Sequence, residues 1–186
     1  SNRLPIILLN IIFVANSTLI AGISICFTLV SISGTINFAL YPYFGRRYVK
    51  SLKRRNILLA KKTMIYSQLL SGSIYVLYFM LLFILGEYVL KIYNPDYVEY
   101  YPYLVFYSSI MIINQFFGVS DYLMSLIRKD SYAILFKAVS IVILFLFAFI
   151  ADRLDSVQWF LFAGFFSIFV KNLLSYIFHL KYIIND

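Results

Sequence analysis

Residues 64–86 read MIYSQLLSGSIYVLYFMLLFILG and contain no Asp, Glu, Lys or Arg. A helix of this length would be about 35 Å long, because each residue of an α-helix rises 1.5 Å. The hydrocarbon core of a bilayer is about 30 Å thick, so a helix over this stretch is long enough to cross it. The sequence therefore predicts a transmembrane helix at 64–86.

Stretches of similar length and character follow on the C-terminal side. They cover residues 102–126, 132–151 and 157–179. Each is mostly apolar, and the segments between them are short. They predict three further membrane-spanning helices.

On the N-terminal side, residues 4–44 contain no charged residue. This length is too great for one upright helix and short for two, so we interpret it as a half-span or re-entrant segment at 4–14 and a full helix at 17–41. Pro42 would then stand where that helix stops, a position at which a missing N–H costs little. The predicted fold is all-α, a polytopic transmembrane bundle of about five spans plus the N-terminal half-span. We expect residues 1–186 to form a single transmembrane domain.

The composition supports a membrane protein and argues against several classes of site. Hydrophobic residues make up 62% of the chain and charged residues 13%, whereas soluble domains are about 45–50% apolar and about 25% charged. One cysteine, Cys26, and one histidine, His179, cannot build a disulfide framework or a metal cluster. We find no phosphate-binding glycine loop and no set of nucleophile and base. We therefore expect no enzyme, no metal and no cofactor.

The charged residues predict the topology. Half of the 16 basic residues lie between residues 46 and 62, with no Asp or Glu among them, so the positive-inside rule places this segment in the cytoplasm. The acidic segment 87–101 would lie outside, the turn at 127–131 inside, and the turn at 152–156 outside. This alternation supports the predicted spans independently of hydropathy. It also places Asn16 outside and Asp186 in the cytoplasm.

The basic segment has two interpretations. It could serve as a topological anchor that rests on anionic lipid, with each basic residue contributing about 1 kcal/mol near the surface. It could also contact the phosphate of a lipid headgroup. Nucleic acid is an unsuitable partner, because the segment lies between two membrane spans. The candidate contacts to anionic lipid or headgroup are Arg46, Arg47, Lys53, Arg54 and Arg55.

Ionisable residues inside predicted spans are costly and need a physical reason. Lys171 lies about 12 Å from the cytoplasmic interface, so it could face a polar cavity, snorkel, or form an ion pair. Lys137 is close enough to that interface to snorkel easily. Asp121 has Arg128 two turns away, too far for direct contact, so we expect its partner to be water or a neighbouring helix. We expect His179 to lie at the interface.

The adjacent amides Asn114 and Gln115 fall at the middle of the 102–126 span. On a helix they point about 100° apart, so at least one should face other helices. Interhelical hydrogen bonding and binding of a polar substrate are both compatible with this position.

Three segments carry a resemblance to a known family. Residues 36–42, INFALYP, are followed by YFG and a basic stretch that ends in LAKK at 59–62. Residues 89–97 read VLKIYNPDY, and residues 120–129 read SDYLMSLIRK. Together these resemble the bacterial polysaccharide and O-antigen flippases of the multidrug/oligosaccharidyl-lipid/polysaccharide exporter superfamily. The acidic residue common in that family's basic loop is missing here, and Tyr100 and Tyr101 replace its usual small residue.

This resemblance implies a position in the second helix bundle of a longer transporter in the bacterial cytoplasmic membrane. It implies transport of a polyprenyl-diphosphate-linked oligosaccharide for surface polysaccharide biosynthesis, with membrane lipid and the remaining helices of the parent protein as partners. For such a substrate we predict binding by Lys171, Lys137, Asn114 and Gln115, from their polarity at depth and not from a family motif. The alternatives are a cation-coupled drug or metabolite exporter and a non-transporting assembly subunit.

Overall fold

A computed structural model describes residues 7–8, 11, 17–127, 129–153 and 156–185. Within these ranges the chain is helical and contains no strand. The helices are α2 (Ser17–Lys53), α3 (Ile57–Tyr93), α4 (Tyr101–Leu126), α5 (Asp130–Arg153) and α6 (Val157–Asn185), with a short 3-10 helix, η1 (Pro95–Tyr100), between α3 and α4. The predicted half-span at 4–14 lies almost entirely outside the described residues.

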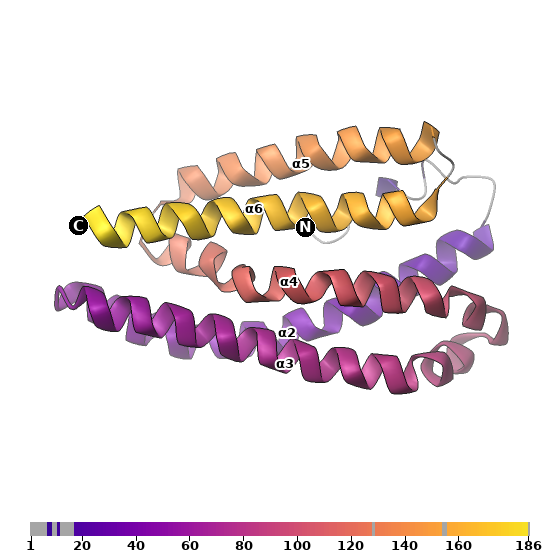
Figure 1. Ribbon diagram of the computed structural model, residues 1–186, viewed down its shortest axis with the longest axis horizontal. Coiled ribbons are helices and arrows are strands. Elements are labelled where there is room, and N and C mark those ends of the chain that lie inside the picture. The colour runs from indigo at the N-terminus through magenta and orange to yellow at the C-terminus, as the bar shows by residue number, and fades with distance from the viewer. Residues whose placement is uncertain (1–6, 9–10, 12–16, 128, 154–155, 186) are drawn as a thin grey trace.

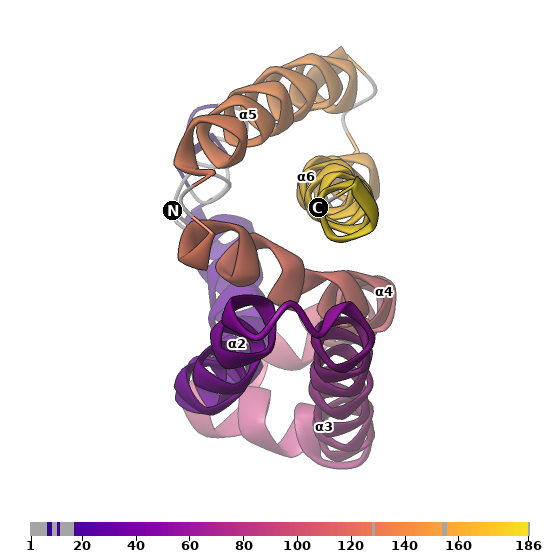
Figure 2. The same ribbon diagram turned by 90° about the vertical axis from the view of Figure 1, so that its left-hand side faces the viewer.

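All five long helices among the described residues are long and apolar enough to cross a membrane. The predicted all-α transmembrane bundle is therefore confirmed, and the chain is a multi-pass membrane protein. Helices α2, α3 and α4 pack against one another (Figure 1). Helix α6 packs on α4, and α5 packs chiefly on α6, so that α6 lies between α5 and the rest of the bundle (Figure 2). In the chain, α5 connects α4 to α6 and runs in the opposite direction to both. Helices α4 and α6 are therefore parallel.

Helices α2 and α3 are longer than the sequence predicts. Each has 37 residues, which corresponds to about 55 Å and exceeds the hydrocarbon thickness. The prediction that α2 ends near Pro42 is wrong, since the helix continues through Pro42 to Lys53. Pro42 removes one hydrogen bond, the one that would reach the carbonyl of Phe38. Phe44 and Tyr48 beyond it are 3% and 0% exposed, and their packing holds the helix together past this point.

The spans predicted at 17–41 and 64–86 leave a long connection between them, but the observed connection is short. Residues 54–56 alone connect α2 to α3. Arg55 takes a left-handed conformation with φ of 54°, which reverses the chain within this short turn. Asn56 then caps α3, because its side chain accepts a hydrogen bond of 2.9 Å from the backbone N–H of Leu59. Six of the eight basic residues of this segment therefore lie on the two helices, and only Arg54 and Arg55 lie in the turn.

The connections that we predict to be cytoplasmic lie at one end of the bundle. The α2–α3 turn, the α4–α5 connection and the C-terminal end of α6 share this end, on the left in Figure 1. We call it the basic end. Its described basic residues are Arg46, Arg47, Lys50, Lys53, Arg54, Arg55, Lys61, Lys62, Lys129 and Lys181. The acidic residues Glu87, Asp96 and Glu99 lie at the opposite end. Arg128, Asp155 and Asp186 lie outside the described residues.

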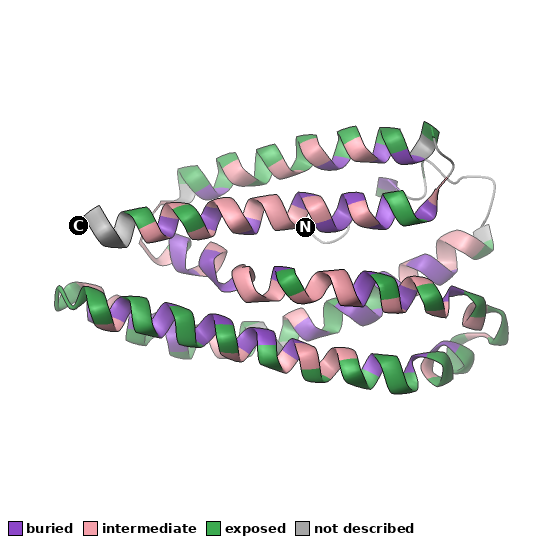
Figure 3. Ribbon diagram, in the orientation of Figure 1, coloured by how far each residue is buried: buried purple, intermediate pink, exposed green. Residues whose placement is uncertain are grey.

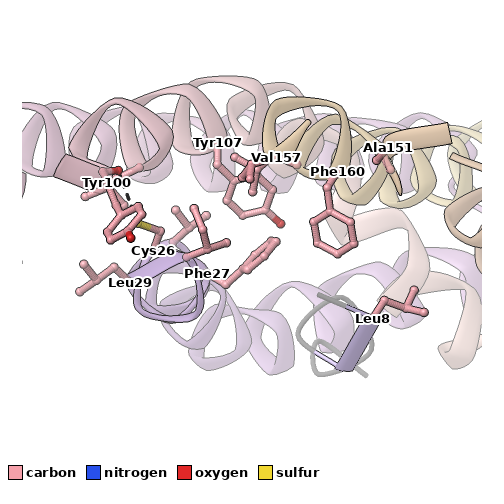
Figure 4. Close-up of a cluster of buried hydrophobic side chains, with 14 of the residues drawn as sticks. Leu8, Cys26, Phe27, Leu29, Tyr100, Tyr107, Ala151, Val157 and Phe160 are labelled. Atoms are coloured by element: carbon pink, nitrogen blue, oxygen red, sulfur yellow. Dashed lines mark hydrogen bonds between the residues drawn. The ribbon is translucent and has the colours of Figure 1, made fainter. Parts of the chain in front are cut away.

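The larger apolar core lies away from the basic end and draws buried residues from α2, α3, α4, α5 and α6. Its aromatic centre is Phe27, whose ring centroid lies 4.7 Å from that of Tyr107 and 6.5 Å from that of Phe160, both edge-on (Figure 4). The buried thiol of Cys26 lies 3.8 Å from the backbone carbonyl of Tyr100. The outward faces of α3 and α5 are exposed and apolar (Figure 3). Such faces are suited to lipid or to neighbouring helices.

Candidate functional site

The candidate site is a row of polar side chains between the parallel helices α4 and α6. We call it the polar seam and define it by Asn114 and Asp121 of α4 and Lys171, Asn172 and Ser175 of α6. Asn114 and Asp121 are two helical turns apart and therefore share one face of α4. The seam lies in the half of the bundle nearer the basic end. Polar side chains are rare at such depth in membrane helices and usually face the bundle interior.

An ion pair joins the two helices. Nζ of Lys171 lies 3.1 Å from Oδ2 of Asp121, and each side chain is about one-fifth exposed, at 20% and 21%. The partner of Asp121 is therefore on a neighbouring helix, and of the alternatives for Lys171 the structure selects the ion pair. Each charge lowers the cost of burying the other. Oδ1 of Asp121 has no hydrogen-bond partner among the described residues.

Two asparagines continue the seam away from the basic end. Nδ2 of Asn114 donates to the carbonyl of Phe165 at 3.3 Å and lies 3.2 Å from the sulfur of Met111. Nδ2 of Asn172 donates to the backbone carbonyl of Asn114 at 3.4 Å. Both asparagines are almost completely buried, and within the described ranges neither amide oxygen has a partner. The amide N–H groups thus hold α4 to α6, while the oxygens stay able to accept.

Gly118 lies on α4 between these two groups and leaves space in the seam. The nearest atoms to a side chain placed there would be Nδ2 of Asn172 and the hydroxyl of Tyr41, each 4.0 Å away. Tyr41 comes from α2, so a third helix reaches the seam. Its ring stacks on that of Tyr122 with a centroid distance of 4.9 Å and an interplanar angle of 20°. Polar groups of α2 and α6 therefore meet α4 at Gly118, where a Cβ would make ordinary van der Waals contact with both.

Closer to the basic end, polar side chains bond across further helix pairs. Nε2 of Gln68 on α3 donates to the hydroxyl of Ser120 on α4 at 3.0 Å. The hydroxyl of Tyr48 on α2 hydrogen-bonds Nε2 of His179 on α6. His179, which we predict to lie at the interface, is completely buried by the surrounding helices. The extension of α2 beyond Pro42 covers it, and this extension was not anticipated.

The remaining predicted substrate-binding residues lie apart from the ion pair. Gln115 follows Asn114 on α4, is half-buried and has an interaction partner of its own. Lys137 lies on α5 with an exposed side chain, so it is not part of the polar seam. The predicted lipid contacts Arg46, Arg47, Lys53, Arg54 and Arg55 are all exposed at the basic end.

Three members of this arrangement were not singled out from the sequence. Asn172 and Ser175 belong to the seam itself, and Tyr41 reaches it from α2. Asn172, Ser175 and His179 are spaced by three and four residues, which places them on one face of α6. That spacing was the available signal for a polar helix face, whereas the contribution of Tyr41 depends on how α2 packs.

Comparisons with protein-family models, with characterised proteins and with solved structures find no match to this chain. The family resemblance described above therefore stays a hypothesis. The assignment of a function depends on the chemistry of the polar seam and of the basic end.

Proposed function

We propose that this chain forms part of a transporter that moves a polyprenyl-diphosphate-linked oligosaccharide across the bacterial cytoplasmic membrane, for surface polysaccharide biosynthesis. The observation that supports the proposal is the Lys171–Asp121 pair, 3.1 Å apart inside a bundle of apolar helices. Ionisable groups at this depth are typical of substrate and ion pathways and are unusual in membrane anchors.

The seam offers groups suited to both parts of such a substrate. The ammonium of Lys171 can form charge-assisted hydrogen bonds with a diphosphate. The unpartnered amide oxygens of Asn114 and Asn172 can accept hydrogen bonds from sugar hydroxyls. The described helices would form one bundle, and the remaining helices of a longer protein would supply the second bundle needed for alternating access.

A second candidate is a cation-coupled exporter of drugs or metabolites. The observation that favours it is Asp121, whose Oδ1 is buried and has no partner among the described residues. A carboxylate oxygen in this state can bind a proton or a metal cation. In this alternative, replacement of Asp121 abolishes export of the drug or metabolite. The lipid-linked oligosaccharide is not a substrate.

The test is deletion of the parent gene, followed by measurement of lipid-linked oligosaccharide and surface polysaccharide in the same cells. We expect the lipid-linked repeat unit to accumulate and the surface glycan to be lost. Complementation with Lys171→Met should fail at normal protein level, and complementation with the exposed-site variant Lys91→Gln should succeed. Unchanged levels of both glycans after deletion would reject the proposal and leave the exporter and the assembly subunit as the alternatives.

A further inference from the structure

A pocket of about 510 Å³ lies between α2 and α4 at the basic end. Its polar wall consists of Arg46, Lys50 and Lys53, and its apolar wall includes Val49, Tyr122 and Leu126. The three basic residues are spaced by four and three positions and therefore form one row along α2. This selects two of the five basic residues predicted to contact lipid and adds Lys50, which was not predicted.

The pocket exists because α2 continues past Pro42 and passes close to α4. A side chain at Gly45 would place its Cβ 2.7 Å from the hydroxyl of Tyr122 and 2.8 Å from a methyl of Leu126. Glycine therefore permits the two helices to meet at this point. The pocket thus has an apolar floor and a basic rim.

The described residues do not neutralise the positive charge of the rim. Among the described residues, none of Arg46, Lys50 and Lys53 forms an ion pair with an acidic side chain. The nearest acid on the facing helix, Asp121, adjoins Tyr122 in sequence but pairs with Lys171. Like charges four residues apart on a helix repel one another, so a bound anion would stabilise the row.

We propose that this pocket binds a phosphate-bearing ligand, with the phosphate at Arg46, Lys50 and Lys53 and any apolar portion against Val49, Tyr122 and Leu126. Arginine and lysine are the side chains that bind phosphate oxygens with charge-assisted hydrogen bonds. The apolar floor continues into the membrane-spanning part of α2, so a ligand with a lipid chain can keep that chain in hydrocarbon. The pocket is separate from the polar seam, and its occupancy does not require transport.

The experiment measures binding by the full-length protein in phosphatidylcholine nanodiscs. One probe is inorganic diphosphate, followed by calorimetry, and the other is phosphatidic acid, followed by native mass spectrometry of the retained lipid. The pocket variant carries Arg46→Gln, Lys50→Gln and Lys53→Gln. The matched control carries Arg47→Gln, Arg54→Gln and Arg55→Gln, which removes the same charge from the same segment outside the pocket. Val49→Trp places a bulky ring in the pocket without a change of charge.

We expect the pocket variant and Val49→Trp to weaken binding by at least about tenfold, and the matched control by less than about threefold. Loss of diphosphate binding in this pattern assigns the site to phosphate itself. Loss confined to phosphatidic acid assigns it to a lipid-borne phosphate. Equal loss in the pocket variant and the control would overturn the proposal, as would a failure of both probes to bind. The deletion experiment above is unaffected by either result, so the two proposals fail separately.

Discussion

Tyr48 and His179 are separated by 131 positions in the sequence, yet they hydrogen-bond each other in the interior of the bundle. Tyr48 lies on the part of α2 beyond Pro42, and His179 lies near the C-terminal end of α6. Both side chains are completely buried. The bond therefore attaches the extension of α2 to α6, a helix that is distant from α2 in the sequence.

Replacement of Tyr48 by Phe should destabilise the protein. The change keeps the ring but leaves Nε2 of His179 without its partner, which costs about 1–3 kcal/mol for a buried polar group. Thermal unfolding in detergent should show a lower midpoint. Tyr88→Phe is the matched control, because Tyr88 is 67% exposed. Equal midpoints for Tyr48→Phe and Tyr88→Phe would mean that the bond contributes nothing to stability.

The Lys171–Asp121 pair predicts an asymmetry between single and double variants. Lys171→Met leaves an unpaired carboxylate inside the bundle, and Asp121→Asn leaves an unpaired ammonium. Fully buried pairs lose about 3–5 kcal/mol when one partner is removed, and partial exposure of this pair should reduce the loss to about 2–3 kcal/mol. The double variant should unfold closer to wild type than either single variant does, in the same detergent assay.

Additive losses in the double variant would contradict a direct coupling between these two side chains. The double variant also separates stability from transport. If it folds well and still fails to complement the gene deletion, the charges serve the substrate and not only the packing of α4 against α6.

Gly72 should not tolerate a side chain. A Cβ at this position would lie 2.2 Å from the ring of Phe116, so either this ring or the helices α3 and α4 would have to shift. We expect Gly72→Ala to cost about 1–3 kcal/mol, as overpacking does elsewhere. Gly34→Ala is the control, since no atom lies within 4 Å of its Cβ position and alanine favours the helix by about 0.5–1 kcal/mol. Unfolding midpoints that rank the two variants in the reverse order would disprove the close packing.

The orientation of the bundle can be tested with single cysteines. Cys26 is 1% exposed and should not react with a membrane-impermeant maleimide, so the native chain provides the background. Glu99→Cys, at the end opposite the basic end, should be labelled in intact cells. Arg55→Cys, in the α2–α3 turn, should be labelled only after permeabilisation, because the positive-inside rule places it in the cytoplasm. Labelling of Arg55→Cys in intact cells would show that the basic end faces outward, which contradicts the predicted topology.

The membrane spans could be predicted because apolar length is a local property of the sequence. Residues 64–86 and 102–126 lie within observed helices for this reason. The end of α2 could not be predicted in this way. A proline inside a helix removes only one hydrogen bond, and the packing of the residues beyond it decides whether the helix continues. With α2 ending near residue 41, Tyr48 would not reach α6, so the burial of His179 against Tyr48 could not be predicted.

The candidate site was only partly predictable. Lys171 and Asn114 were recognised because polarity at depth is visible in the sequence. The pairing of Lys171 with Asp121 depends on the parallel packing of α4 and α6, which no local pattern encodes. The pocket at Arg46, Lys50 and Lys53 likewise depends on the approach of α4 at Gly45. Residue type therefore identified individual candidates, and the arrangement of helices determined which of them meet.

Helix α5 precedes α6 in the chain, yet α6 lies between α5 and the rest of the bundle. It packs chiefly on α6 and has few contacts with α4, its predecessor in the chain (Figure 2). Consecutive helices usually become neighbours as they are synthesised. In this bundle α6 instead takes the place between α4 and α5. The ion pair and the buried amides join α4 to α6, so the polar seam can form only after α6 has been made.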